Sequence, residues 1–285
     1  MDKENKNQEI RPDILTTDDV VEMVPKLAKH RKLVDTLLHW IGVDRVNGIH
    51  RRYCDTPGPE FARRLVFEEF KVKLRIDNED ILDNLPEGPF ITVSNHPFGQ
   101  LDGIVLTYLI TSRRPKYRLM VNMILNRITA MRQNFIAVDA LQSDDPKKKA
   151  VSMQGIRDAI KNVRQGEPIG FFPAGAVSKW DRHLELTDRE WQPTVVRLIQ
   201  QLKVPVIPIF FHGDNSFLFN FLGVTCWQLR TLMLPRELFR KTGKEMHISV
   251  GQPIPVEEQL KHQGSVKEFG EFLKAETYRL RKIYR

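Results

Sequence analysis

The sequence predicts an α/β fold: a mostly parallel, mixed sheet flanked by helices, with an N-terminal helical layer. From residue 89 onward, short runs rich in β-branched and aromatic residues alternate with longer segments of helical periodicity. Parallel strands need a long crossover between them, usually a helix, and such helices cover both faces of the sheet. Before residue 86, the apolar residues recur mainly at helical spacing.

The same patterns divide the chain into three regions. Residues 1–12 are polar and mixed in charge, so we expect a disordered tail that is neither a signal peptide nor a transit peptide. Residues 13–85 form the N-terminal helical region, and residues 86–285 form the α/β domain.

The N-terminal region begins with a helix-start signal. Thr16 to Asp19 offer N-cap side chains and negative charge for a first helical turn. Helical patterns continue to about residue 41, where Gly42 is expected to end them. Residues 61–72 then predict another helix that mixes aromatic with basic residues. This helix either packs on the core or rests on anionic lipid.

The α/β domain alternates strands with helices. The expected strands cover residues 90–94, 117–121, 135–138, 169–172, 206–210 and 247–250, and the expected helices cover residues 101–112, 146–164 and 193–202. Of these helices, 146–164 has the clearest signals: Asp145 can cap it, Pro146 suits its first position, and Gly166 can close it.

Residues 217–234 are the most apolar part of the chain. They contain four aromatic residues, and four cations lie within or just beyond them: Arg230, Arg236, Arg240 and Lys241. One interpretation is a core helix, and the other is an interfacial segment whose cations meet lipid phosphates. The longest apolar run, 217–227, contains Asn220 and is too short to span a bilayer, so we expect no transmembrane helix.

Net charge and cysteine content indicate which partners and which cellular compartment suit this protein. The 285 residues carry a formal net charge of +8, with a pI of about 9.4. This excess favours an anionic partner, such as a membrane surface, acyl carrier protein or coenzyme A. Nucleic acid is not expected, because no nucleic-acid module is present and the basic residues are spread along the chain. The two cysteines, Cys54 and Cys226, form no disulfide framework and suit a reducing compartment.

The chemistry is expected in the loop that follows the strand over residues 90–94. There the chain reads Asn95-His96-Pro97-Phe98-Gly99-Gln100-Leu101-Asp102 before a helix. Ligands of α/β folds bind beyond the carboxyl ends of strands. Histidine is the side chain best suited to take a proton near neutral pH, and a carboxylate on its other ring nitrogen fixes its orientation. His96 and Asp102 form such a dyad if the loop folds back.

These residues resemble the first motif of the glycerolphosphate acyltransferase superfamily, which includes the lysophospholipid acyltransferases. Three further stretches follow in the family's order: Asn134-Phe135-Ile136, Phe172-Pro173-Ala174-Gly175 and Val204-Pro205-Val206-Ile207-Pro208. Four motifs in order over about residues 85–255 are more specific than any one alone. The resemblance implies that the α/β domain is an acyltransferase domain with His96 and Asp102 as catalytic residues.

The sequence departs from the family pattern at three places. Five residues separate His96 from Asp102 where the family has four, Ala174 replaces the acidic residue of the third motif, and Val138-Asp139 stands where an arginine is expected. In the family, those acidic and basic positions help to hold glycerol phosphate. With His-Pro-Phe-Gly at the first motif, the chain resembles the bacterial branch described as hemolysin-like, or as O-acyltransferases of amino-acid lipids such as ornithine or glycine lipids.

The expected substrate-binding residues come from the first and third motifs. They are Asn95, Phe98, Gly99, Phe172, Pro173, Gly175, Ser178, Lys179 and Arg182. The small residues after Phe172 let a substrate approach the backbone, whose N–H groups would stabilise an oxyanion. Ser178, Lys179 and Arg182 are expected near an anionic head group or phosphopantetheine, or they are ordinary solvated side chains. Ser178 is not expected as a nucleophile, because no nucleophile-elbow motif surrounds it.

No metal site is expected. His212 and Asp214 follow a strand, but two ligands with no further His or Cys nearby in the sequence are too few. Gly213 and Asp214 are expected to form a turn.

The resemblance implies an O-acyltransferase at the cytoplasmic face of the membrane. It would move a fatty acyl group from an acyl carrier protein or coenzyme A thioester, its co-substrate, to the hydroxyl of a lysolipid, with no other cofactor. A lyso-amino-acid lipid is the first choice of acceptor and lysophosphatidate the second. Two alternatives remain open: a non-catalytic, hemolysin-like membrane-binding protein, and a thioester hydrolase that uses the same dyad.

Overall fold

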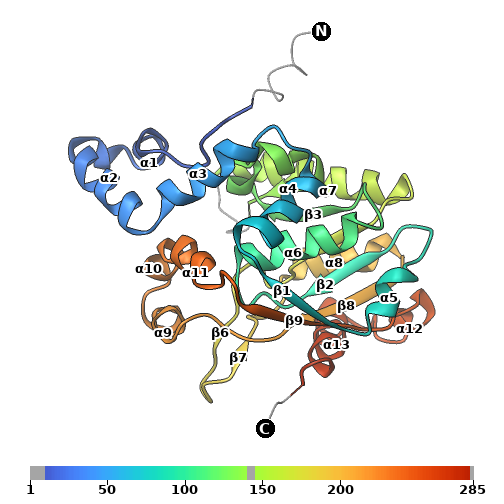
Figure 1. Cartoon of the computed structure of the whole chain (residues 1–285). Coiled ribbons are helices and arrows are strands. Elements are labelled where there is room, and N and C mark those ends of the chain that lie inside the picture. The colour runs from blue at the N-terminus through green and yellow to red at the C-terminus, as the bar shows by residue number, and fades with distance from the viewer. Residues whose placement is uncertain (1–9, 140–144, 283–285) are drawn as a thin grey trace.

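A computed structural model of the chain describes residues 10–139 and 145–282. At its centre lies a seven-stranded sheet with the order β1-β9-β8-β2-β5-β3-β4 (Figure 1). The strands are β1 (Lys73–Asp77), β2 (Ile91–Ser94), β3 (Arg118–Asn122), β4 (Phe135–Val138), β5 (Ile169–Phe171), β8 (Val206–Phe211) and β9 (Glu245–Val250). Neighbouring strands are parallel except β8 and β9, which are antiparallel. The predicted mostly parallel, mixed sheet is confirmed.

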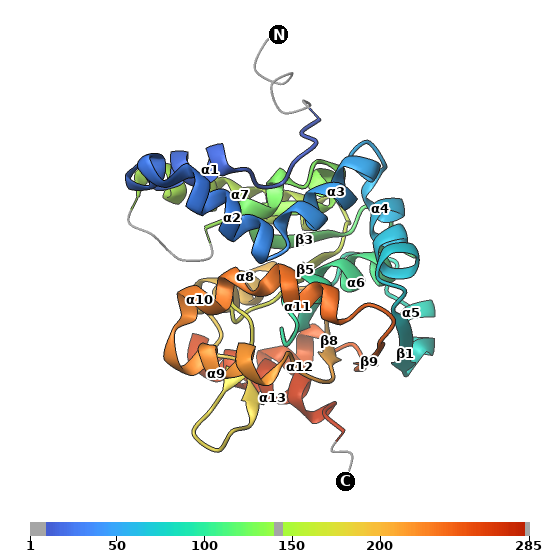
Figure 2. The same ribbon diagram turned by 60° about the vertical axis from the view of Figure 1, so that its left-hand side comes forward.

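Helices cover both faces of this sheet (Figures 1 and 2). On one face, α4 (Gly58–Arg64) and α6 (Gln100–Thr111) bury Phe61 and Leu106 against Ile207 and Ile209 of β8. On the other face lie α7 (Pro146–Arg164), α8 (Pro193–Leu202) and α13 (Val266–Arg279), with α5 (Glu79–Asp83) and α12 (Val256–Leu260) at the margin of the fold.

Local sequence signals set several of these helices. Asp145 accepts a hydrogen bond from the Lys147 N–H and Pro146 is the first residue of α7, as predicted. In the N-terminal layer, Thr16 and Asp19 form a reciprocal capping box at the start of α1 (Thr17–Met23). The remaining helices of that layer are η2 (Pro25–His30), α2 (Arg31–Trp40) and α3 (Val43–Tyr53).

The N-terminal layer packs on a group of helices that follows β8. These are α9 (Phe217–Thr225), α10 (Trp227–Leu232) and α11 (Leu234–Arg240). The Arg45 guanidinium lies 3.9 Å from the centre of the Phe239 ring, and Arg236 lies 5.8 Å from that of Trp40. Figure 2 shows α2 and α3 beside α10 and α11.

The region expected to be helical differs from the prediction at its end. After α4 the chain forms one π-helical turn, η3 (Leu65–Glu69), and then enters the sheet as β1. β1 pairs with β9, about 170 residues away in the chain, and that partner is what makes the segment a strand. Residues 1–9 of the expected disordered tail lie outside the described residues.

Shorter elements complete the fold. The antiparallel pair β6 (Lys179–Trp180) and β7 (Leu186–Thr187) forms a hairpin beside the main sheet, and η4 (Met123–Arg127) and η5 (Thr129–Asn134) connect β3 to β4. None of the helices within residues 10–139 and 145–282 is both long and apolar enough to cross a bilayer.

The close packing of β5 on its neighbours makes a stability prediction. A Cβ added at Gly170 would lie 1.8 Å from the Tyr117 hydroxyl oxygen, which hydrogen-bonds Thr92 in the core. Gly170→Ala is therefore expected to lower the free energy of unfolding by about 2–3 kcal/mol. The control Gly48→Ala, in α3 with no atom within 4 Å of the new Cβ, should raise it by about 0.5–1 kcal/mol. Equal urea midpoints for the two variants would contradict the packing argument.

Candidate active site

The loop between β2 and α6 is folded around one buried carboxylate. Asp102 is the third residue of α6, and its Oδ2 accepts the N–H groups of Phe98 at 2.9 Å and Gly99 at 3.0 Å. Gly99 has φ +84°, and a Cβ there would lie 2.8 Å from Leu234. Only glycine fits that conformation and that space.

The folded loop places His96 against Asp102. Nδ1 of His96 lies 3.0 Å from Oδ2 of Asp102, across the five intervening residues. The carboxylate is fully buried, whereas the imidazole side chain keeps 19% of its surface exposed. The distance is that of an ion pair, but the ring is not aligned for a linear hydrogen bond; such contacts commonly tighten when substrate binds.

Burial raises the pKa of Asp102, and the contact with His96 and the two loop N–H groups oppose that rise. On its other side, the imidazole stacks on Phe172, with ring centres 4.1 Å apart. The ring is thus held between a carboxylate edge and an aromatic face. No described residue hydrogen-bonds its Nε2.

Three polar side chains fix this loop to distant parts of the chain. The Asn95 amide exchanges two hydrogen bonds with the backbone of Phe211, at 2.7 and 2.9 Å. Asn215 donates to the carbonyl of Pro97 at 2.9 Å. The His96 N–H donates to Asp188 at 3.3 Å. The loop is therefore fixed to both β8 and the segment after β7.

Of the expected substrate-binding residues, some lie beside the His96 ring and others hold the loop in its conformation. Phe172 forms the aromatic wall beside His96, and Phe98 is buried, with the Lys241 ammonium 4.4 Å from its ring centre. Asn95 and Gly99 shape the loop from within. Pro173 accepts the N–H of Gln192, and a Cβ at Gly175 would clash with the Gln192 side chain.

Among the expected contacts after the third motif, Ser178 needs correction. Ser178 is 1% exposed, and its hydroxyl donates to Asp188 at 2.5 Å, so it supports the loop from behind and does not face a ligand. Lys179 is half-buried in β6, and Arg182 is exposed at the turn of the hairpin. The N–H groups of Gly175 and Ser178 donate to the carbonyls of Phe172 and His96, so neither is available to an oxyanion.

Asp188 is the positioning residue that the sequence analysis missed. It is 3% exposed, and besides His96 and Ser178 it accepts the indole N–H of Trp191 at 3.2 Å. Burial raises the pKa of Asp188, and these donors oppose the rise. No motif marks it, because its partners lie up to 92 residues away.

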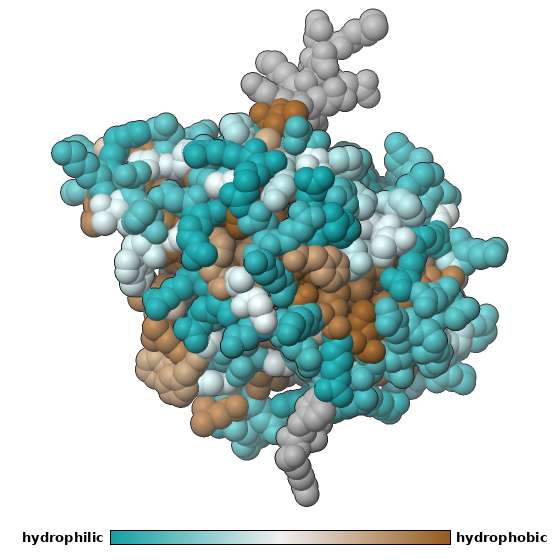
Figure 3. All heavy atoms as spheres, viewed as in Figure 1, coloured by the Kyte–Doolittle hydropathy of each residue, from teal (hydrophilic) through white to brown (hydrophobic). Residues whose placement is uncertain are grey.

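The helices α9 and α10 expose the apolar residues that a core helix would bury. The exposed fraction is 73% for Phe217, 48% for Phe221, 62% for Val224 and 49% for Trp227. Figure 3 shows apolar residues gathered over the region where α9 and α10 lie in Figure 1. A core helix therefore does not describe this side of α9 and α10, and the interfacial interpretation stays a prediction.

The cations of this segment are arranged differently from the expectation. Arg230 is only 5% exposed and donates to the carbonyls of Val177 and Ser178, so it does not reach a membrane surface. Lys241 donates to the carbonyl of Asp214. Arg236 and Arg240 remain exposed.

Beside β8, His212 has neighbours that the sequence did not reveal. His212, His247 and Asp77 each place one potential ligand atom within 4.8 Å of the others. The imidazoles stack with centres 4.1 Å apart, and Asp77 lies 2.6 Å from His247 Nε2. The Lys282 ammonium lies 3.0 Å from Asp77 and already supplies a cation there. The expectation of no bound metal stays a prediction.

Comparisons with known proteins agree with this architecture. A family model described as "Acyltransferase" matches residues 19–284. Two curated relatives named lyso-glycine lipid O-acyltransferase are similar along most of the chain. The protein from Phocaeicola vulgatus is 27% identical over 263 residues, covering 88% of each chain. The protein from Bacteroides thetaiotaomicron is 26% identical over 270 residues, covering 90% of this chain and 93% of its own.

A solved structure shows the same fold. It is the 1-acyl-sn-glycerophosphate acyltransferase PlsC from Thermotoga maritima, with a TM-score of 0.51 and 14% sequence identity. The match covers 78% of this chain and 76% of that one.

His212 makes the stability of the protein depend on pH. Burial, together with His247, Lys282 and Arg281, lowers the pKa of His212 to about 4, while Asp77 opposes the shift. Between about pH 6.5 and 4, His212 therefore binds a proton in the unfolded chain but stays neutral in the folded protein. This contribution to stability is present above pH 6.5 and is lost as the pH falls to 4. Melting temperatures of His212→Gln should therefore fall less over this range than those of the parent. The control His30→Gln, at an exposed histidine, should follow the parent curve.

Proposed function

The chain belongs to the acyltransferase family, as its motifs predicted, and from that premise we propose that it is an O-acyltransferase of lysolipids. It moves a fatty acyl group from an acyl thioester, on acyl carrier protein or coenzyme A, to a lysolipid hydroxyl. One observation carries the proposal: His96 Nδ1 lies 3.0 Å from the buried carboxylate of Asp102, beyond the end of a central parallel strand.

The geometry supports a general-base reaction. Asp102 holds the proton on Nδ1 of His96, which leaves the lone pair of Nε2 for the acceptor hydroxyl. As the hydroxyl oxygen attacks the thioester carbonyl, its proton moves to Nε2. The tetrahedral intermediate then collapses to an ester, and the imidazolium returns the proton to the departing thiolate. No further cofactor takes part.

The proposed acceptor is a lyso-amino-acid lipid. Ala174, which replaces the family's acidic residue, is 4% exposed and packs in the apolar core, so it offers no group that could bind glycerol phosphate. The two curated relatives act, by their names, on a lyso-glycine lipid. Their similarity over almost the whole chain supports the same class of acceptor.

We also propose that the protein rests on an anionic lipid surface through α9 and α10. Their exposed aromatic residues, described above, would enter the boundary between head groups and acyl chains. The net charge of +8 adds long-range attraction to anionic lipid. A peripheral position of this kind brings an acyl chain to the site without a spanning helix.

His96→Ala tests the proposed reaction. The loop keeps its backbone hydrogen bonds, so the variant should fold, while kcat/KM for acyl transfer should fall about 10²–10⁴-fold. Product formation from a labelled thioester and a panel of lysolipids, followed by mass spectrometry, measures this. The matched control is His39→Ala, which removes an exposed histidine that lies 2.6 Å from Asp44; it should transfer at the parent rate.

The acceptor panel also separates the alternatives. Ester product from lysophosphatidate but not from amino-acid lysolipids would overturn the proposed acceptor. Free fatty acid released without any lysolipid would indicate a hydrolase. A His96→Ala variant as fast as the parent would exclude the dyad.

A double substitution tests the lipid surface. The Phe217 and Phe221 rings stack with centres 6.3 Å apart on the exposed side of α9. Changing both to Ser should weaken binding to vesicles that contain phosphatidylglycerol by about tenfold or more, because two aromatic insertions are lost. The control Leu260→Ser removes an apolar side chain that is 54% exposed on α12 and should bind like the parent. Equal sedimentation of all three proteins with vesicles would contradict this surface.

A further inference from the structure

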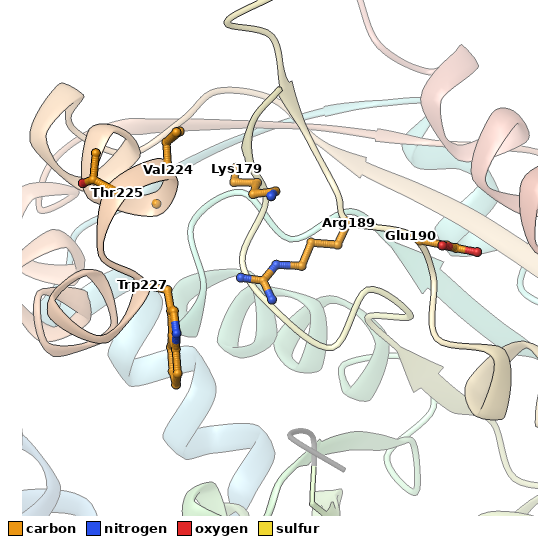
Figure 4. Close-up of a pocket in the computed structure, with 7 residues that line it drawn as sticks. Lys179, Arg189, Glu190, Val224, Thr225 and Trp227 are labelled. Carbon is orange, nitrogen blue, oxygen red and sulfur yellow. The ribbon is translucent and has the colours of Figure 1, made fainter. Parts of the chain in front are cut away.

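A pocket of about 520 Å³ lies where the hairpin β6–β7 meets the junction of α9 and α10. Lys179 and Arg189 line it from the hairpin side, and Gly223, Val224 and Trp227 line it from the helices. Figure 4 shows the Arg189 guanidinium extending toward the space between Lys179 and Trp227. We call this the cation pocket.

The cations of the cation pocket form no ion pair within the part of the chain that the structure describes. Among the described residues, no ion pair joins Lys179, Arg189 or Arg230 to a carboxylate. Arg230 stands behind the wall: a Cβ at Gly223 would lie 3.1 Å from its guanidinium. It is 5% exposed, and its Nε has no hydrogen-bond partner in the described part of the chain. A buried, incompletely paired guanidinium is costly unless an anion approaches it.

Two details strengthen the case for an anion. Burial, with the nearby charge of Arg189 as the smaller cause, lowers the pKa of Arg230 to about 10. The carboxylate that lines the pocket, Glu190, points away from Arg189 in Figure 4, and its charge acts on Lys274 instead. The charges therefore repel one another, and a bound anion would relieve that repulsion.

The cation pocket is joined to the candidate active site through the backbone. The residues just before its two cations, Ser178 and Asp188, are the ones that hydrogen-bond the backbone of His96. A ligand that occupies the pocket is thus bound by the same two segments that position the imidazole. Val224 and Trp227 add apolar surface, which suits the acyl arm of a lipid.

We propose that Lys179 and Arg189 bind the free carboxylate of the acceptor's amino-acid head group in the cation pocket, with Arg230 adding charge from behind the wall. The assignment rests on the proposed function. An amino acid joined to a fatty acyl group through its amine keeps its carboxylate, and the planar fork of an arginine matches a carboxylate with two parallel hydrogen bonds. The pocket thereby selects amino-acid lipids by charge.

Binding without turnover tests the pocket independently of the reaction. N-dodecanoylglycine has the carboxylate but no hydroxyl to acylate, and N-dodecanoylglycinamide lacks the charge. Calorimetry should show that the parent binds the acid about 10–100-fold more tightly than the amide. In the double variant Lys179→Ala/Arg189→Ala this preference should fall to about one. Arg189→Lys, which keeps the charge but loses the fork, should lie between.

The matched control is Arg157→Ala/Lys161→Ala, which removes two cations that line another hollow on α7; it should keep the parent's preference. Both cations of the cation pocket reach solvent, so circular dichroism should show an unchanged fold in the double variant. An acid-to-amide preference in the double variant equal to the parent's would overturn the assignment.

Turnover then separates the acceptor from the donor. With a lyso-amino-acid lipid, the double variant should lose about 10–100-fold in kcat/KM for the acceptor and keep the KM of the thioester. A rise confined to the KM of the thioester would instead place a donor phosphate in the pocket and overturn the proposal. If the parent acylates no lysolipid but still prefers the acid in calorimetry, the proposed function fails while the cation pocket stands.

Discussion

The whole site depends on the buried carboxylate of Asp102. With no exposed surface, this carboxylate would be costly to bury unless donors surrounded it. Two loop N–H groups donate to its Oδ2, and the His96 imidazole lies 3.0 Å from the same oxygen. The charge beside the histidine is therefore also the charge that folds the loop. The extra residue between His96 and Asp102 is absorbed in this way: the loop wraps around the carboxylate, and Gly99 takes a conformation that other residues would resist.

Polar contacts with distant parts of the chain hold the loop in position. Asn215 and Asp188 bond the loop's backbone, and the Asn95 side chain bonds the backbone of Phe211 in β8. None of these hydrogen bonds uses the imidazole. Catalytic groups need positions held to a fraction of an ångström, and backbone contacts hold them without competing for the imidazole. Asp188 has a further consequence, because it ties the hairpin β6–β7 to the histidine.

Because Asp188 joins the hairpin to His96, three chemically different surfaces lie close together. The imidazole lies beside an aromatic wall, the cation pocket opens next to the hairpin, and the exposed apolar side of α9 and α10 continues from the rim of the pocket. A lipid acceptor has the same three parts: a hydroxyl, a charged head group and an apolar chain. In the proposed assignment, the buried Arg230 adds its charge from beneath the pocket wall.

The sequence by itself determined the local parts of this protein. The caps and periodicity of residues 146–164 and the helical pattern of residues 193–202 predicted α7 and α8 at their observed bounds. The β-branched runs predicted all but one strand of the main sheet within two residues. His96 and Asp102 stand in one loop after a strand, next to a proline and a glycine that restrict it, and the resemblance to the first acyltransferase motif supported the prediction that they pair.

Only the tertiary structure decided which distant residues support them. β1 became a strand because β9 lies beside it, His212 found His247 and Asp77, and Asp188 reached His96 from 92 residues away. The sequence predicted Arg230 as a surface cation, whereas in the folded chain it is buried. Periodicity and capping act over a few residues along the chain, whereas burial and charge pairing depend on what the folded chain brings next to each side chain.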